Sequence, residues 1–169
     1  MNSINIIQEL EKNKAVFKEL LSNNIKEAYL WKQEPKKWCL LEIVCHLYDE
    51  EREDFRTRVD YVLENPERTL PPFDPVSWVA DRNYIGQDYK SKVESLLLER
   101  TNSINWLQSL KNPKWDNTYQ HPKLGSLSAK LFLSNWLAHD YLHIKQIIRL
   151  KFDYLKYHSG ENLNYAGAW

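Results

Sequence analysis

Hydrophobic residues recur every three or four positions over four long stretches of the chain, with charged residues between them. This period is typical of amphipathic helices, which bury one apolar face and expose the other. The expected helices cover about residues 3–30, 39–64, 88–110 and 127–154. No stretch shows a convincing strand-like alternation, and no internal repeat is visible. The pattern therefore predicts an all-α fold.

Residues that cap or break helices set the expected boundaries. Asn2 or Ser3 is placed to cap the first helix, and Ser126 is placed to cap the last. Pro35 ends the first helix, because a proline disfavours helical backbone at the residue before it. The helix and connection lengths together predict a single domain, residues 1–169, built as an up-down-type four-helix bundle.

One long crossover loop connects the second and third helices. Its prolines, which exclude a central strand or a long helix, stand at positions 66, 71, 72 and 75. Asp74 followed by Pro75 predicts a short helix over residues 76–83. A loop of this length in a small domain is usually functional or disordered, and its large aromatic residues argue against disorder.

The aromatic residues of this loop are candidates for lining the mouth of a substrate pocket. They are Phe73, Trp78 and Tyr84. Simple packing of the loop onto the bundle explains them equally well, so both interpretations stay open.

The composition narrows the class of protein. The formal net charge is zero and no run of Lys and Arg stands out, whereas proteins that bind nucleic acid usually carry a basic patch. No segment approaches the roughly 20 apolar residues of a membrane span, and no signal peptide is visible. Cys39 and Cys45 lie in an apolar run at a spacing unsuited to a disulfide. We therefore expect a cytoplasmic protein with neither nucleic acid nor membrane as a partner.

Three of the five histidines suggest a metal site. His139 and His143 lie four positions apart in "WLAHDYLHIKQ", so they are neighbours on one helical face and can hold one ion. An isolated pair of this kind more often packs in a core, each ring bonded to a carbonyl. However, His46 also stands on the apolar face of its helix, in "EIVCHLYDEE". Three histidine ligands with open positions form a catalytic type of metal site.

Other polar residues accompany these histidines. Glu50 follows His46 by about one helical turn and is a candidate catalytic residue, either as a fourth ligand, as a general base or as a group that orients a ligand. Asp140 is next to His139, and an interhelical ion pair is its alternative role. Asn135 and Gln146 extend the histidine stripe and are candidates for the pocket around the metal.

Several segments, in this order, resemble the DinB-like superfamily, which includes YfiT-type proteins. They are "KKWCLLEIVCHLYDEEREDFRTRV", "PPFDPVSW" and "QHPKLGSLSAKLFLSNWLAHDYLHIKQI". The resemblance covers most of the chain and implies a four-helix bundle in which three histidines hold one divalent metal. Carried over, the ligands are His46, His139 and His143. The family often binds nickel or zinc, and imidazole ligands leave iron or manganese open.

The resemblance also implies a class of reaction. Better-understood branches are metal-dependent S-transferases that use bacillithiol, mycothiol or glutathione, and other members are called metal-dependent hydrolases. We therefore expect a low-molecular-weight-thiol S-transferase that acts on small electrophiles. The alternatives are a hydrolase that uses metal-bound water and a non-catalytic metal-binding protein of the stress response. The expected partner is a small-molecule substrate, and a homodimer stays open.

Histidine ligands also predict a dependence on pH. An imidazole must be neutral to bind a metal, and its usual pKa is about 6.5. We therefore expect metal affinity to fall as the pH drops below about 6. If the histidines lie in an open, hydrated cleft, the metal-free protein should be less sensitive to the same change.

Overall fold

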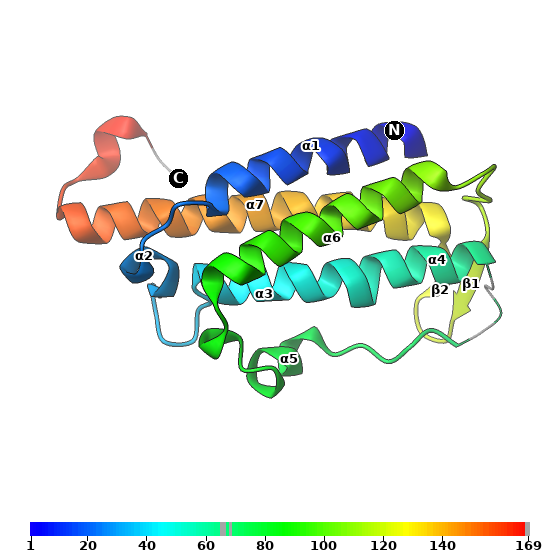
Figure 1. The fold of residues 1–169 in the computed structure, drawn as a ribbon, viewed down its shortest axis with the longest axis horizontal. Coiled ribbons are helices and arrows are strands. Elements are labelled where there is room, and N and C mark those ends of the chain that lie inside the picture. Colours follow the sequence, from blue (N-terminus) through cyan, green and yellow to red (C-terminus); the bar gives the residue numbers. More distant parts are fainter. Residues whose placement is uncertain (65–66, 68, 168–169) are drawn as a thin grey trace.

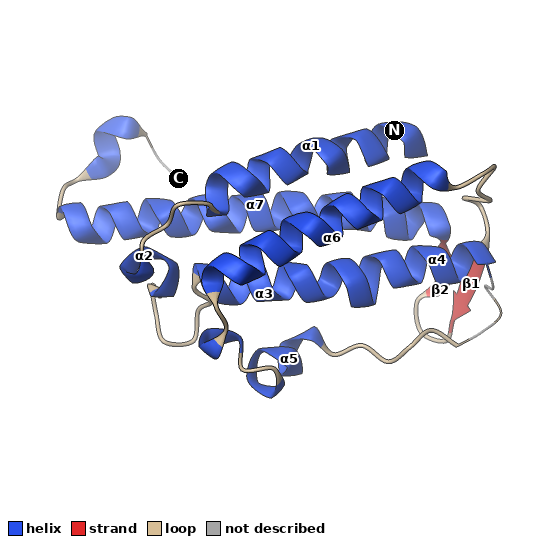
Figure 2. Ribbon diagram, viewed as in Figure 1, coloured by secondary structure: helices blue, strands red, loops and turns tan. Residues whose placement is uncertain are grey.

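The computed structural model describes residues 1–64, 67 and 69–167. Within these residues, long helices pack side by side into a four-helix bundle, and a small β-hairpin lies at one end (Figures 1 and 2). The four-helix bundle predicted from the hydrophobic pattern is therefore confirmed. No helix of the described residues combines the length and the apolar character that crossing a membrane requires.

The first predicted helix is divided in two. α1 (Ser3–Leu21) is capped by Asn2, whose side chain accepts a hydrogen bond from a backbone N–H of the first turn. α2 (Lys26–Leu30) follows after a break at which Asn23 has a left-handed backbone, with φ at 59°. The expectation of one continuous helix was wrong, because the polar run around Asn23 favours a turn.

The second predicted helix is continuous but irregular. α3 (Leu40–Glu50) leads into a π-helical segment (Glu51–Arg56) and then into α4 (Thr57–Glu64). The Thr57 hydroxyl donates a hydrogen bond of 2.7 Å to the Arg52 carbonyl oxygen inside the wider turn. Such π segments are rare and frequently occur at functional sites, because they change which side chains face inward.

The crossover loop carries the short helix expected there. α5 (Pro75–Asp81) is capped by Asp74, which accepts a hydrogen bond from the Ser77 N–H at 3.2 Å. A 3₁₀ turn (Tyr84–Gly86) then leads to α6 (Tyr89–Ser109), which is the third predicted helix. Pro66 of the predicted loop lies outside the described residues.

A hairpin that the sequence pattern did not reveal precedes the last helix. β1 (Thr118–His121) and β2 (Gly125–Ser128) pair in antiparallel fashion, and α7 (Ala129–Ser159) begins directly after them. The expected cap at Ser126 was wrong, because that residue pairs with β1. Ser128 caps α7 instead, its hydroxyl oxygen accepting a hydrogen bond of 3.0 Å from a first-turn N–H.

The order of the helices around the bundle determines which residues meet. α1 packs against α6 and α7, and the continuous α3–α4 helix packs against the same two. α1 and α3–α4 therefore occupy opposite corners. Followed by colour in Figure 1, the crossover loop returns the chain so that α6 runs parallel to α3–α4, whereas α7 runs antiparallel to it. Residues of α3 consequently face residues of α7.

A polar layer separates two apolar regions of the core. One region contains buried residues such as Phe17 and Leu96, and the other contains Leu10 and Ile104. On each helix, buried polar residues stand between the residues of the two regions. They include Asn13 on α1, Glu51 in the π segment, Arg100 on α6 and Asp140 on α7. The candidate histidines lie beside this layer.

Candidate metal centre

Three histidines converge where α3 faces α7. The Nε2 atoms of His46 and His139 are 3.3 Å apart, and those of His139 and His143 are 3.0 Å apart. One possible ligand nitrogen from each ring lies within 4.8 Å of the other two. The structure therefore brings together the three residues selected from the sequence, and their role as metal ligands stays a prediction.

The start of α3 fixes the position of its histidine. Cys39 caps this helix, and its backbone N–H donates a hydrogen bond of 2.9 Å to the Glu42 carboxylate. Glu42 also pairs with Lys32 at 2.7 Å, which ties the preceding loop to the helix. With this first turn held, His46 faces α7 two turns later.

Burial keeps the three rings neutral. It lowers the pKa of His46 to about 3 and that of His139 to about 2, and neighbouring histidines add to both shifts. Burial also lowers the pKa of His143. Aromatic rings exclude water here, because Trp38 lies 4.9 Å from His46 and Phe55 lies 4.9 Å from His139, measured between ring centroids. Each imidazole consequently has one unprotonated nitrogen at neutral pH.

The donor set fits a divalent metal. In a tetrahedral site with metal–nitrogen distances of about 2.0–2.1 Å, ligand nitrogens lie roughly 3.3 Å apart, which is close to the separations observed here. The Nδ1 atoms of His46 and His143 are buried and have no hydrogen-bond partner among the described residues. A histidine that binds a metal through one ring nitrogen usually donates the N–H of the other ring nitrogen to a carboxylate or a carbonyl. His46 and His143 make no such hydrogen bond with the described residues.

Glu50 stands beside the converging nitrogens. Its Oε1 is 3.7 Å from the Nε2 of His46, and the side chain is buried. Burial raises the pKa of Glu50 to about 8, and the nearby carboxylate of Asp54 adds to this shift. A carboxyl group with such a pKa can take up or release a proton near neutral pH. The position is compatible with each of the three roles considered for Glu50.

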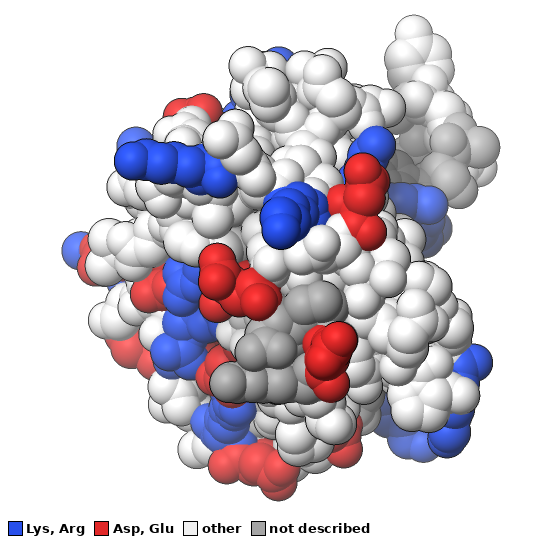
Figure 3. Space-filling model, turned by 90° about the vertical axis from the view of Figure 1, so that its right-hand side faces the viewer, with Lys and Arg blue, Asp and Glu red and all other residues white. Residues whose placement is uncertain are grey.

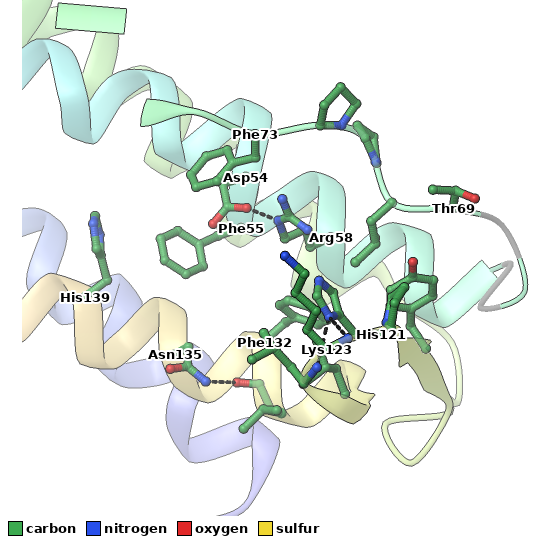
Figure 4. Close-up of a pocket in the computed structure, with 18 of the residues that line it drawn as sticks. Asp54, Phe55, Arg58, Thr69, Phe73, His121, Lys123, Phe132, Asn135 and His139 are labelled. Atoms are coloured by element: carbon green, nitrogen blue, oxygen red, sulfur yellow. Dashed lines mark hydrogen bonds and ion pairs between the residues drawn. The ribbon is translucent and has the colours of Figure 1, made fainter. Parts of the chain in front are cut away.

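A cleft of about 840 Å³ opens next to the histidines (Figure 4). Its walls come from the crossover loop, the β-hairpin, α4 and α7, and His139 belongs to them. The volume falls in the range of about 300–1,000 Å³ that is typical of sites for small molecules. The polar side chains around it, which the sequence did not single out, are Asp54, Arg58, Thr69, His121 and Lys123.

The remaining sequence candidates divide between the cleft and other places. Phe73 and Asn135 line the cleft. Trp78 stacks instead on Arg82, 4.0 Å from the guanidinium carbon to the ring centroid. Tyr84 is buried in the core, and its hydroxyl donates a hydrogen bond of 2.7 Å to Asp49. For Trp78 and Tyr84 the structure therefore shows packing of the loop, which was one of the two interpretations left open, and neither residue lines this cleft.

The two other candidates flank the histidines on α7. Gln146 is exposed and lies near enough to His143 to oppose the lowering of its pKa, although it is not bonded to the buried Nδ1. Asp140 turns away from the three histidines and accepts hydrogen bonds of 2.6 and 2.7 Å from Arg100. The interhelical ion pair, its alternative role, is the one observed.

The comparisons with known proteins agree with this architecture. A family model described as the DinB superfamily matches residues 9–147, which include all three histidines. Among solved structures the chain is similar to one described as "YfiT from Bacillus subtilis is a probable metal-dependent hydrolase with an unusual four-helix bundle topology". The TM-score is 0.77 at 18% identity, covering 95% of this chain and 89% of that one, which shows the shared fold. The comparison with curated proteins gives no match. On the strength of the family model, the chain belongs to the DinB superfamily.

Proposed function

We propose that this protein is a divalent-metal-dependent enzyme that transfers a low-molecular-weight thiol to a small electrophile. The observation that carries the proposal is the convergence of three histidine nitrogens, one of them from His139 in the wall of a cleft large enough for small reactants. His46, His139 and His143 would hold the metal, with nickel or zinc the expected ion and iron or manganese open. When bound, the metal would act as a Lewis acid that lowers the pKa of a nucleophile.

The thiol has to come from a cosubstrate. Cys39 and Cys45 are both free and buried. Burial raises the pKa of Cys39 to about 11 and that of Cys45 to about 12. Because the thiolate is the nucleophilic form, neither residue is reactive at neutral pH. Two free thiols also suit the reducing cytoplasm, where we place the protein.

Glu50 supplies the proton acceptor in this proposal. Its carboxyl lies 3.7 Å from the His46 nitrogen, next to the place where the nucleophile has to stand. There it can take the proton that a thiol releases on attack. The mostly apolar walls, which include Phe55 and Phe132, exclude water from the same region.

The position of Glu50 also favours a second candidate, a metal-dependent hydrolase. In that case the same carboxyl takes the proton of an attacking water molecule. The two candidates use the same residues and differ in the nucleophile that enters the cleft. The third possibility, a non-catalytic metal-binding protein, predicts a gain in stability on metal binding without turnover.

One experiment separates the three. The protein, purified without a histidine tag, is first analysed for bound metal and then loaded with nickel or zinc. Monochlorobimane is the electrophile, with and without glutathione or bacillithiol, and 4-nitrophenyl acetate tests hydrolysis. Conjugation that needs both metal and thiol, and that is lost in His143→Ala, supports the transferase. Ester hydrolysis without thiol supports the hydrolase, and a raised melting temperature with no turnover overturns both enzymatic proposals.

A further inference from the structure

The positive and negative charges of the side chains that line the cleft do not cancel. Two cationic side chains, Arg58 and Lys123, and one anionic side chain, Asp54, line it, which leaves a net charge of +1. Much of the remaining wall is apolar and includes Phe73, Phe132 and a row of leucines. These leucines are Leu124, Leu127, Leu131 and Leu142. Three of them are exposed although they are large and apolar: Leu124, Leu131 and Leu142.

Arg58 is held in place, but part of its guanidinium group makes no hydrogen bond to the described residues. Its Nε donates a hydrogen bond to Asp54 one turn earlier on the helix. The rings of Phe73 and Phe132 lie 5.1 and 6.0 Å from the guanidinium carbon. Its two terminal NH₂ groups have no hydrogen-bond partner among the described residues. A planar fork of this kind is suited to binding a carboxylate or phosphate through two hydrogen bonds.

Lys123 reaches the same cleft from a different element. It lies in the turn of the β-hairpin, where the backbone N–H groups of Lys123 and Leu124 each donate a hydrogen bond of 3.1 Å to the Nδ1 of His121. Its ammonium group has no partner among the residues that the structure describes. In Figure 4 the Lys123 side chain extends from the hairpin toward Arg58, and His139 lies at the other end of the cleft.

Two cations that face one cleft repel each other, and Asp54 neutralises only one of them. An anion that binds both would relieve this repulsion. The surface around the hairpin end has no broad area of positive or of negative charge, because Lys and Arg side chains are interspersed there with Asp and Glu (Figure 3). The geometry is therefore suited to one small anionic group and not to a phosphate backbone, which requires an extended basic surface.

We propose that Arg58 and Lys123 form an anion subsite for a small amphiphilic molecule. Its carboxylate or phosphate group would bind at these two residues, and its apolar body would lie along the leucines and Phe132 toward His139. This inference rests on the proposed function, because it names the class of molecule that the cleft presents to the metal site. Its test measures binding alone and needs neither metal nor turnover.

The test uses two fluorescent probes that share a ring system. The anionic probe is 8-anilinonaphthalene-1-sulfonate, and N-phenyl-1-naphthylamine lacks its sulfonate. Both are titrated into the metal-free full-length protein, into Lys123→Met and into Lys130→Met, a control lysine that is exposed on α7 outside the cleft. We expect Lys123→Met to weaken binding of the sulfonate roughly tenfold, the loss of one charge-assisted contact, and to leave binding of the neutral probe unchanged. Lys130→Met should change neither.

Competition against the anionic probe identifies the anion. Octanoate and octyl phosphate should displace the anionic probe at concentrations at least roughly tenfold lower than the concentration of octanol that is needed. Displacement by only one of the two anions assigns the subsite to a carboxylate or to a phosphate. Equal displacement by octanol, or equal weakening of both probes by Lys123→Met, would overturn the inference. Anion binding without any thiol transfer would leave the subsite standing and refute the proposed reaction.

Discussion

Two groups of buried polar side chains lie next to each other in the bundle and are built in opposite ways. In the Arg100 group, the guanidinium donates hydrogen bonds to Glu51, to Asp140 and to the Leu10 carbonyl oxygen. Asn13 and Trp136 complete this group by donating to the same two carboxylates. In the histidine group, three neutral rings point their Nε2 atoms at one another, and two buried Nδ1 atoms have no partner in the described part of the chain.

The contrast separates a structural cluster from a candidate binding site. Buried charges that are fully hydrogen-bonded hold elements in one arrangement, and here they join all four corners of the bundle. Three neutral imidazole rings that turn their Nε2 atoms toward one another present electron pairs to one point, and a cation bound there would explain why the arrangement persists. The two groups are also neighbours in sequence, since Glu51 follows Glu50 and Asp140 follows His139. The Arg100 group therefore fixes the helix rotations that direct the histidines toward one point.

The largest expected effect comes from breaking the Arg100 group. Arg100→Met leaves the carboxylates of Glu51 and Asp140 buried without their cation, which should lower the free energy of unfolding by about 3–5 kcal/mol. The measurement is urea denaturation of the metal-free protein. Lys12→Met, which removes an exposed pair with Glu9, is the control and should leave the free energy of unfolding almost unchanged. If the two variants lost similar amounts of unfolding free energy, the Arg100 group would not be a structural cluster.

Removing one histidine should affect metal binding and leave the fold intact. A four-ligand zinc site contributes about 10–16 kcal/mol, which is roughly 2.5–4 kcal/mol per ligand, so His143→Ala should lose about that much metal-binding free energy. Helicity measured by circular dichroism should persist, because the apolar core does not depend on the ion. His121→Ala, which changes a cleft histidine outside the cluster, should still bind metal. Collapse of the helices in His143→Ala would show that the site is structural.

Glu50 tests whether the histidine group is catalytic. Glu50→Gln removes the proton acceptor but keeps the shape of the side chain, so we expect a fall in kcat of about 100-fold with metal content unchanged. Glu53→Gln, an exposed position in the same acidic run, should retain full activity. If the Glu50 variant loses its metal, Glu50 is a ligand and its role as a base has to be abandoned.

A further expected effect, which accumulates with each pH unit, is a dependence of metal-free stability on pH. His46 and His139 take up protons near pH 6.5 when unfolded, but their folded pKa values are about 3 and about 2. Between these values the unfolded chain holds more protons, so stability falls as the pH drops below about 6.5. Each histidine contributes at most about 1.4 kcal/mol per pH unit. The sequence-based expectation of a less sensitive metal-free protein was conditional on histidines in an open, hydrated cleft; His46 and His143 are buried and His139 is half-buried, so that condition is not met.

Glu50 opposes this trend. Burial raises its folded pKa to about 8, so the stability that it contributes is complete below its usual pKa and is lost as the pH rises through about 8. Asp54, whose pKa is also raised by burial, acts in the same sense. With His143, whose pKa is also lowered by burial, three histidines stand against these two carboxyls, so the net loss on acidification should persist and should be steeper in Glu50→Gln. Melting temperature against pH in both proteins is the measurement, and a flat profile below pH 6.5 would contradict the buried, neutral rings.

The sequence predicted the helices because each buries one periodic apolar face, and it predicted the histidine group because all three residues lie on such faces. It did not reveal the π segment, since "EEREDFRTR" contains a single apolar residue, Phe55, and so has no apolar period in which an extra residue could be seen. The hairpin was missed because its strands are only four residues long and its register depends on the turn at Gly125, where φ is 75°. Arg100 and Glu51 gave a weaker signal, namely a charge on an otherwise apolar helical face.

The direction of α6 has a consequence for how this family can diversify. Because the crossover loop returns the chain along the bundle, the start of that loop and the β-hairpin meet at the same end, where both form walls of the cleft. The three histidines stand on helices, whereas much of the cleft wall stands on connections, which tolerate insertion and exchange. Evolution can therefore change which molecule enters without altering the histidines. An engineer could change the ligand specificity in the same way, by transferring residues 69–73 together with residues 118–128 from one family member to another.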